Sequence, residues 1–148
     1  MNLISIICLV LPIALGFLSG SFTAENIPSW YVHLNKPSFN PPNYLFAPVW
    51  TVLYILMGYG WGRVQKINPR AWLFFAPQMI LNMSWSWVFF VQHQIGWALV
   101  NIAALWISIL VMLLFFARQD RLAGYLQIPY LLWVSFATVL NAAIWQLN

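Results

Sequence analysis

Charge is what this chain has least of. Only 5% of its 148 residues are charged, as six lysines and arginines and two carboxylates. A soluble domain usually carries about 25% charged residues, so this chain cannot cover a water-facing surface. The formal net charge of +4 comes mainly from two short basic stretches, which suit lipid headgroups better than nucleic acid. The composition therefore predicts a protein of the lipid bilayer with no nucleic-acid partner.

The groups used in common enzyme chemistry are also scarce. The two carboxylates, Glu25 and Asp120, fall in loops on opposite predicted sides of the membrane and cannot form an acid–base pair. The single cysteine, Cys8, has no disulfide partner and is predicted to be a small buried apolar residue. No His, Cys, Asp or Glu cluster has metal-ligand spacing, and no Gly-rich phosphate loop is present. We therefore expect no conventional catalytic residue, no metal site and no obligatory cofactor.

Long apolar runs, by contrast, are abundant. Five of them approach the length of about 20 residues that a membrane-crossing helix requires. Backbone in lipid must satisfy its own hydrogen bonds, and the chain lacks the short alternating strands of a barrel. We therefore predict an all-α membrane protein with one domain (1–148), a bundle of five transmembrane helices and a structured first loop (23–45) acting as a lid. The predicted spans cover residues 3–22, 46–62, 71–91, 95–117 and 122–145.

The distribution of basic residues predicts the orientation. The first loop contains only Lys36, whereas the two links on the opposite side contain Arg63, Lys66, Arg70, Arg118 and Arg121. The positive-inside rule then places the N-terminus in the cytoplasm, with the C-terminus and the first loop on the other side. The first span has no basic residue before its apolar run, so we expect it to be retained and not cleaved as a signal peptide.

Tryptophan is the most informative residue that is present. Several of the ten copies lie at mid-helix depth, away from the interfaces where Trp usually anchors. Aromatic and amide side chains recur there at helical spacing, and such faces suit a large planar ligand with polar edges. The alternative is that they only pack helices together. The three stripes are Trp50, Tyr54, Met57 and Trp61; Gln78, Asn82, Trp85 and Phe89; and Tyr130, Trp133, Ala137, Asn141 and Ile144.

Other features leave alternatives open. The small-residue stretches 16–20 and 58–62 predict close helix contacts, either within one bundle or across a homodimer. Lys36 could pair with a ligand carboxylate or with a lipid headgroup. His33 and His93 lie in loops on the same predicted side, where His33 could contact a ligand carboxylate or a haem iron, or each could simply be solvated.

The first loop and the last span resemble a known family. The matching residues run from Trp30 to the C-terminus and are Trp30-Tyr31, Leu34, Lys36-Pro37, Pro41-Pro42, Phe46, Trp50, Tyr54, Met57-Gly58, Leu81-Asn82, Trp85, Phe89-Phe90, Pro129-Tyr130, Trp133, Phe136-Ala137-Thr138 and Leu140-Asn141. They resemble the TspO/MBR family of bacterial tryptophan-rich sensory proteins and mitochondrial translocator proteins. The latter were once called the peripheral benzodiazepine receptor.

The resemblance implies five transmembrane helices, a homodimer and a ligand pocket beneath the first loop. The implied ligands are tetrapyrroles such as protoporphyrin IX or haem, together with synthetic isoquinoline carboxamides and benzodiazepines. The implied role is that of a receptor in porphyrin transport, sensing or regulation. The family's pocket positions fall on Tyr31, Trp50, Tyr54, Asn82, Trp85, Ser86, Trp133, Ala137 and Asn141.

One motif of the animal members is broken in this chain. Their cholesterol-recognition motif needs a Tyr and a basic residue where Ala142 and Gln146 stand here. Such motifs are weak even when intact. We therefore expect a bacterial-type member in the cell membrane, without high-affinity sterol binding.

Two alternative functions remain open. The family has been associated with light-dependent porphyrin breakdown, for which Trp50 and Trp133 would be the participating residues and no acid, base or metal would be needed. The dipeptide Pro77-Gln78 resembles the proline-glutamine motif of small sugar and amino-acid carriers, although no second copy is present. The second alternative is therefore a subunit of a small-solute transporter.

Overall fold

The computed structural model describes residues 2–148, and within that range the chain forms helices and loops without strands. The predicted all-α class is confirmed. Between the main helices lie short 3₁₀ turns (η1, η2 and η3) and one π-helical turn (η4). The elements in order are α1 (Leu3–Ser29), η1 (Tyr31–His33), η2 (Asn43–Leu45), α2 (Phe46–Ile67), η3 (Pro69–Ala71), α3 (Trp72–Ser86), η4 (Trp87–Val91), α4 (Ile95–Gln119), α5 (Arg121–Tyr125) and α6 (Ile128–Leu147).

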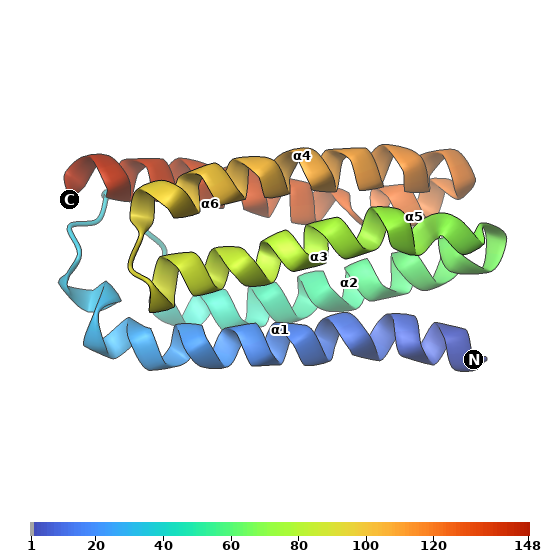
Figure 1. Ribbon diagram of the computed structural model, residues 1–148, viewed down its shortest axis with the longest axis horizontal. Coiled ribbons are helices and arrows are strands. Elements are labelled where there is room, and N and C mark those ends of the chain that lie inside the picture. Colours follow the sequence, from blue (N-terminus) through green and yellow to red (C-terminus); the bar gives the residue numbers. More distant parts are fainter. Residues whose placement is uncertain (1) are drawn as a thin grey trace.

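The helices run side by side along the long axis of the molecule (Figure 1). The end that holds η1, η2 and the C-terminus is termed the loop end, and the opposite end, which holds the α2–α3 and α4–α5 links, is termed the basic end. Four helical segments are long and apolar enough to cross a membrane, which agrees with a membrane protein. They are Leu3–Ser29, Asn43–Ile67, Ile95–Gln119 and Arg121–Leu147.

The third predicted span is the exception. It covers α3, which has 15 residues, and the five residues of η4 that follow directly. At 1.5 Å per residue α3 alone is about 22 Å long, whereas the hydrocarbon core of a bilayer is about 30 Å thick. This segment is therefore not among the four that qualify by their own length.

The first helix is longer than predicted. Helix α1 continues to Ser29, so residues 23–29, which were assigned to the loop, are helical. Polar side chains mark the end of the apolar run, but here they bond within the helix. Thr23 Oγ1, Asn26 Nδ2 and Ser29 Oγ donate to carbonyls four residues earlier, at 3.4, 2.8 and 3.0 Å. The loss of hydropathy therefore marks the end of the apolar run and not the end of the helix.

The last predicted span lies within one of the four qualifying segments, Arg121–Leu147, but its helix is interrupted between α5 and α6. Asp120 caps α5 by accepting a hydrogen bond from the backbone N–H of Ala123 at 3.1 Å. After α5 the chain makes a turn, and Pro129 lies in the first turn of α6. Proline is favoured at this position because the first backbone N–H groups of a helix have no partner within it. A new helix start at Pro129 thus explains the break.

The small-residue stretches serve contact between α1 and α2 within one bundle. A Cβ built on Gly58 would lie 2.7 Å from the carbonyl oxygen of Cys8, and one on Gly62 would lie 3.4 Å from the Cys8 Cβ. A Cβ on Gly16 would overlap the ring of Tyr54. Cys8 itself is buried between the two helices, as predicted. Gly16, Gly58 and Gly62 are thus used within the chain, whereas Gly20 has no neighbour across a helix contact. The homodimer remains a prediction.

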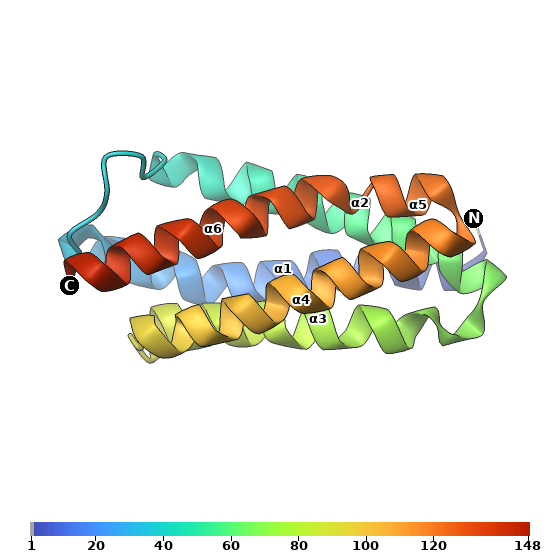
Figure 2. The same ribbon diagram turned by 90° about the horizontal axis from the view of Figure 1, so that it is seen from above.

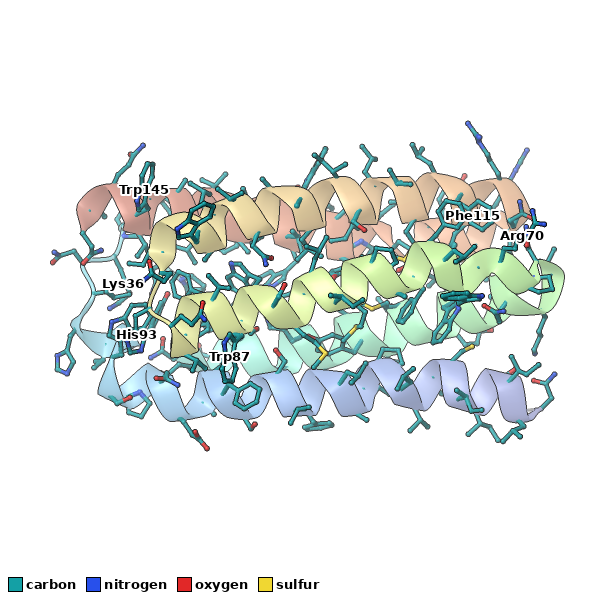
Figure 3. The ribbon with its side chains drawn as sticks, viewed as in Figure 1. Lys36, Arg70, Trp87, His93, Phe115 and Trp145 are labelled. Carbon is teal, nitrogen blue, oxygen red and sulfur yellow. The ribbon has the colours of Figure 1, made fainter. Side chains whose placement is uncertain are left out.

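The half of the bundle toward the basic end is filled by side chains. Trp61 stacks on Phe75 with ring centroids 4.0 Å apart, and Phe74 stacks on Phe115 at 3.8 Å. Figure 3 labels Phe115 and Arg70 in this half. Fully buried apolar side chains complete the packing, namely Met57, Val64, Leu105, Ile109, Met112, Phe116 and Val134. The cavity described below lies in the other half.

An ion pair ties the links at the basic end together. The guanidinium of Arg63 in α2 donates to Asp120 Oδ2 through Nε at 2.8 Å and Nη2 at 2.7 Å. Asp120 stands between α4 and α5, so this contact joins α2 to the last part of the chain. The hydrogen bond from Arg63 holds the pKa of the Asp120 carboxyl below its usual range.

Substitution of Asp120 separates its two roles. Asp120→Asn keeps a capping side chain but removes the charge, and we expect a loss of at most about 1 kcal/mol of stability because the pair is partly exposed. Asp120→Ala removes the cap as well, and we expect it to lower the stability by about 1 kcal/mol more.

The ion pair also makes the stability depend on pH. Because the pKa of Asp120 is lower in the folded protein, the pair stabilises the fold at pH values above the unfolded-state pKa of about 3.9. This contribution is lost as the pH falls through the folded-state pKa. Thermal unfolding of the purified protein between pH 7 and 3 tests this, and identical pH profiles for wild type and Asp120→Asn would contradict it.

Candidate ligand pocket

A cavity of about 450 Å³ lies in the loop half of the bundle. Its walls come from α1, α2, the end of α3, η4 and α6, and Tyr31 of η1 and Asn43 of η2 border it at the loop end. Seen from above, α2 and α6 draw apart toward this end (Figure 2). The volume is within the range of about 300–1,000 Å³ typical of small-molecule pockets.

Helix α2 contributes the ring pair Trp50 and Tyr54, which face the cavity one turn apart. The two rings stack with centroids 5.6 Å apart, and Trp50 also meets Tyr130 of α6 edge-on at 6.1 Å. These contacts lock the indole in place. Spacing of four residues on a helix puts both rings on one face, which is why the sequence pattern found them.

Helix α6 contributes Trp133, Ala137 and Asn141, again at intervals of four residues. Trp133 packs edge-on against Phe46 of α2 at 6.3 Å and lies 5.5 Å from Phe136. Ala137 is small, so the wall recedes at this point. The indoles of Trp50 and Trp133 are both partly exposed, whereas Ala137 and Asn141 are buried.

Trp85 and Asn141 form a hydrogen-bonded pair across the pocket wall. The indole Nε1 of Trp85 donates to Asn141 Oδ1 at 3.1 Å, and Asn141 Nδ2 donates to the backbone carbonyl of Ile95 at 3.0 Å. The side-chain amide of Asn141 thus uses its oxygen to bind Trp85 of α3 and its nitrogen to bind Ile95 of α4. The residue is 2% exposed. Its role in this arrangement is to hold the Trp85 ring in the wall.

A buried polar chain forms the floor of the pocket. Tyr54 Oη donates to Asn82 Oδ1 at 2.8 Å, and Asn82 Nδ2 donates to Tyr130 Oη at 2.9 Å. Tyr130 Oη in turn donates to Gln78 Oε1 at 2.9 Å. Buried polar groups require such partners, and this chain satisfies them with one another. Asn82 thus lies behind Tyr54 and is not among the residues that line the cavity.

Tyr31 connects the first loop to the pocket. Its ring is 3% exposed and packs against Phe89 and Phe90 at 6.2 and 5.8 Å. Burial raises the pKa of the Tyr31 phenol to about 12, so the hydroxyl stays protonated and donates to Asn40 Oδ1 at 2.7 Å. The phenol therefore fixes the loop segment that contains Asn40 over the bundle.

The Lys36 amine is held by the loop itself. Its Nζ donates to the carbonyls of Tyr31, Val32 and Leu34 at 2.9, 3.2 and 2.8 Å, and lies 5.0 Å from the centre of the Tyr31 ring. Lys36 does not border the cavity. Its hydrogen bonds stabilise η1, and a role as ligand partner has no support in this geometry.

The two histidines of the loop end also lie away from the cavity. His93 stacks on Trp30 with ring centroids 4.1 Å apart, and its Nε2 lies 3.3 Å from Asn26 Oδ1. Figure 3 shows His93 and Lys36 at this end of the molecule. His33 is exposed. His93 thus joins α1 to the link before α4.

The structure brings eight of the nine predicted ligand residues to the cavity, and only Asn82 stands behind its wall. The sequence reasoning missed the wall that α1 provides. That wall has no Trp and no amide, so it lacked the signal used for the other helices. A face of small and hydroxyl-bearing residues at helical spacing could have revealed it, namely Gly16, Ser19, Gly20 and Thr23.

Fold and cavity together define a helical membrane protein with an internal aromatic pocket. The signature of the TspO/MBR family matches residues 8–146, and the chain belongs to this family. It is 43% identical to the Tryptophan-rich protein TspO of Chlorobaculum tepidum over 150 aligned positions, which cover 96% of this chain and 94% of that protein. It is 37% identical to the Tryptophan-rich protein TspO of Archaeoglobus fulgidus, with 100% and 99% covered. It is also 35% identical to the human Translocator protein, with 89% and 82% covered.

Proposed function

We propose that this chain binds a tetrapyrrole such as protoporphyrin IX or haem in the loop-end cavity, and that it acts in porphyrin transport, sensing or regulation at the membrane. The observation that carries the proposal is the convergence of Trp50, Trp85 and Trp133 from three helices on one cavity. Each good aromatic contact contributes about 0.5–1.5 kcal/mol beyond area burial. Family membership supports the same ligand class.

The charged edge of such a ligand must stay at the opening. No Lys, Arg or His of the described chain lines the cavity, and a buried carboxylate without a partner is strongly disfavoured. Exposed lining residues mark the opening between α1 and α2, namely Phe17, Gly20, Ser21, Ala24, Ala47 and Thr51. The macrocycle would lie among the indoles with its propionates directed outward.

The cavity suits the ring of haem more than its iron. Its lining, over residues 2–148, contains no His, Cys or Met side chain that could serve as a strong axial ligand. The residues that would hold the macrocycle are the aromatic ones, which stack on it whether or not iron is present. We therefore expect protoporphyrin IX and haem to be recognised through the same contacts.

Titration with protoporphyrin IX tests the proposal. Trp50→Ala and Trp133→Ala each remove one indole from the wall, and we expect each to weaken binding about tenfold, which corresponds to about 1.4 kcal/mol. Quenching of tryptophan fluorescence in the purified protein measures the affinity. The matched control is Trp97→Ala, because Trp97 is 70% exposed and lies away from the cavity. Wild-type affinity in both pocket variants would refute this site.

The proposal includes five membrane crossings. Helix α3 and η4 continue one another along the bundle between its two ends (Figure 1), and they expose the apolar side chains Trp72, Ile80 and Trp87. Such a face is expected to meet lipid. A fifth crossing places the N-terminus and the basic end in the cytoplasm by the positive-inside rule, with the loop end and C-terminus on the other side.

The proposal also assigns a lid and a homodimer. The lid comprises the loop after Ser29, because Tyr31 and Asn43 border the cavity. Asn35 further ties it to the C-terminus, since its backbone N–H donates to Asn148 Oδ1 at 3.0 Å. The family resemblance favours a homodimer, whose face must lie outside the α1–α2 contact. Sterol binding is not part of the proposal.

A further inference from the structure

A groove on the outer surface of the bundle runs between α2 and α6. The two helices draw apart toward the loop end (Figure 2), and one face of each helix lines the gap. The residues on each face recur at intervals of three and four, as expected for one side of a helix. This outer groove is lined by Leu45, Pro48, Val49, Val52 and Leu53 from η2 and α2, and by Pro129, Leu132, Trp133 and Phe136 from α6.

Two aromatic residues separate the outer groove from the ligand cavity. Trp133 and Phe136 border both spaces. Trp133 meets Phe46 edge-on at 6.3 Å, and Phe46 borders the cavity without lining the groove. A molecule in the groove would therefore contact Trp133 from outside the bundle, whereas a ligand in the cavity would contact it from within.

The outer groove is apolar and lies between two membrane-crossing segments. Its walls belong to Asn43–Ile67 and Arg121–Leu147, which are both long and apolar enough to cross a membrane. The rim residues Val52 and Leu132 are 54% and 64% exposed. Of the described residues that line the groove, only Trp133 has a side chain that can form a hydrogen bond, so water would find almost no partner there. Hydrocarbon is the occupant that this surface favours.

The length of the groove matches one leaflet of a bilayer. From Leu45 to Leu53 the α2 wall rises by eight residues, which is about 12 Å at 1.5 Å per residue. Half of the hydrocarbon core is about 15 Å thick. The groove begins at the loop end, where Tyr44 directly precedes Leu45 and is 79% exposed. Tyrosine is typical of the membrane interface, so a lipid with its headgroup near Tyr44 would extend one chain along the groove.

Contacts across the groove limit what can enter it. Trp50 of α2 and Tyr130 of α6 remain in edge-on contact at 6.1 Å, so the gap is too narrow for a helix, which is about 10–12 Å wide with its side chains. No charged side chain of residues 2–148 lines the groove, and the amine of Lys36 at the same end donates to loop carbonyls. Shape and apolar contact would therefore select the occupant, without regard to the charge of its headgroup.

We propose that the outer groove binds one acyl chain of a phospholipid from the leaflet at the loop end, and that it holds this chain more tightly than the surrounding lipid is held. The chain packs against Trp133 and supports the wall between groove and cavity. This binding does not depend on which ligand the cavity holds.

Native mass spectrometry of the protein released from phosphatidylcholine nanodiscs tests the proposal. We expect the wild type to retain one phospholipid per protomer. Val52→Trp places an indole in the groove from its rim, and we expect the lipid-bound fraction to fall about tenfold. Leu132→Trp fills the groove from the opposite rim and should have the same effect if Val52→Trp lowers stability. The matched control is Val139→Trp, because Val139 is 58% exposed on α6 and does not line the groove.

Photocrosslinking locates the retained chain. A phosphatidylcholine with a diazirine in one acyl chain should label residues 45–53 and 129–136 of the wild type, and this labelling should be lost in Val52→Trp but kept in Val139→Trp. The proposal is overturned if the wild type retains no phospholipid, if both groove variants retain it as the wild type does, or if labelling is even over all lipid-facing helices. Retention of an added sterol in place of phospholipid, or a dimer that only the groove variants lose, would assign the groove to that occupant and equally overturn it.

Discussion

Replacing Ala137 with phenylalanine is expected to abolish ligand binding while the bundle remains folded. Ala137 faces the cavity from α6, where its small side chain leaves room between Trp133 and Asn141. A phenyl ring at this position would occupy the space that the ligand needs, in the part of the bundle that is hollow. Because the ring fills an existing cavity, it should not strain the core as an insertion into a packed interior does.

The expected loss of protoporphyrin IX affinity is on the order of a hundredfold or more, which corresponds to about 3 kcal/mol. The matched control is Val139→Phe on the same helix, since Val139 is 58% exposed and its side chain lies outside the cavity. Affinity is measured by tryptophan quenching, and folding by thermal unfolding of the same samples. Ala137→Leu serves as a milder variant if the phenylalanine lowers stability. Unchanged affinity in both Ala137 variants would show that the ligand binds elsewhere.

The second large effect is expected at Gly58, where α1 and α2 are in backbone contact. A methyl group there would meet the carbonyl oxygen of Cys8 at 2.7 Å and the Cα of Leu9 at 3.0 Å. Both obstacles are backbone atoms of a helix, which cannot rotate away as a side chain could. The two helices would have to separate, and we expect Gly58→Ala to destabilise the protein by about 2 kcal/mol.

The contrast with Gly20 makes this prediction specific. No atom lies within 4 Å of a Cβ built on Gly20, so Gly20→Ala should be neutral or slightly stabilising through the higher helix propensity of alanine, worth up to about 1 kcal/mol. Both glycines are in apolar helices, and both substitutions add one methyl group. Unfolding in denaturing detergent, followed by tryptophan fluorescence, compares them. Equal midpoints for the two variants would mean that α1 and α2 do not meet as described.

Helical spacing predicted much of the pocket, because side chains four residues apart share a face in any helix. This is why Trp50 with Tyr54, and Trp133 with Ala137, were placed together correctly. Helical spacing alone does not show at which residue of each aromatic stripe the cavity ends. Met57 and Trp61 continue the stripe of Trp50 but belong to the packed core.

Limits of the helices were harder to predict than their existence. An apolar run signals burial in lipid, whereas a helix continues for as long as its backbone is hydrogen-bonded. Residues 23–29 are polar enough to end the run, yet α1 continues to Ser29. Conversely, apolar character persists from Leu122 to the C-terminus, although the chain turns between α5 and α6.

The amino-acid sequence by itself determined the class of protein and the faces of its helices. Too few charges for a water-facing surface require a bilayer, and helical periodicity aligns the aromatic residues. Only the tertiary structure decided which part of each face is hollow, because that depends on contacts between distant segments. The hydrogen bond from Tyr54 to Asn82 closes the floor, the amine of Lys36 turns to loop carbonyls, and α1 presents Ser19 to the cavity. No local pattern specifies these partners, which come together only when the helices pack.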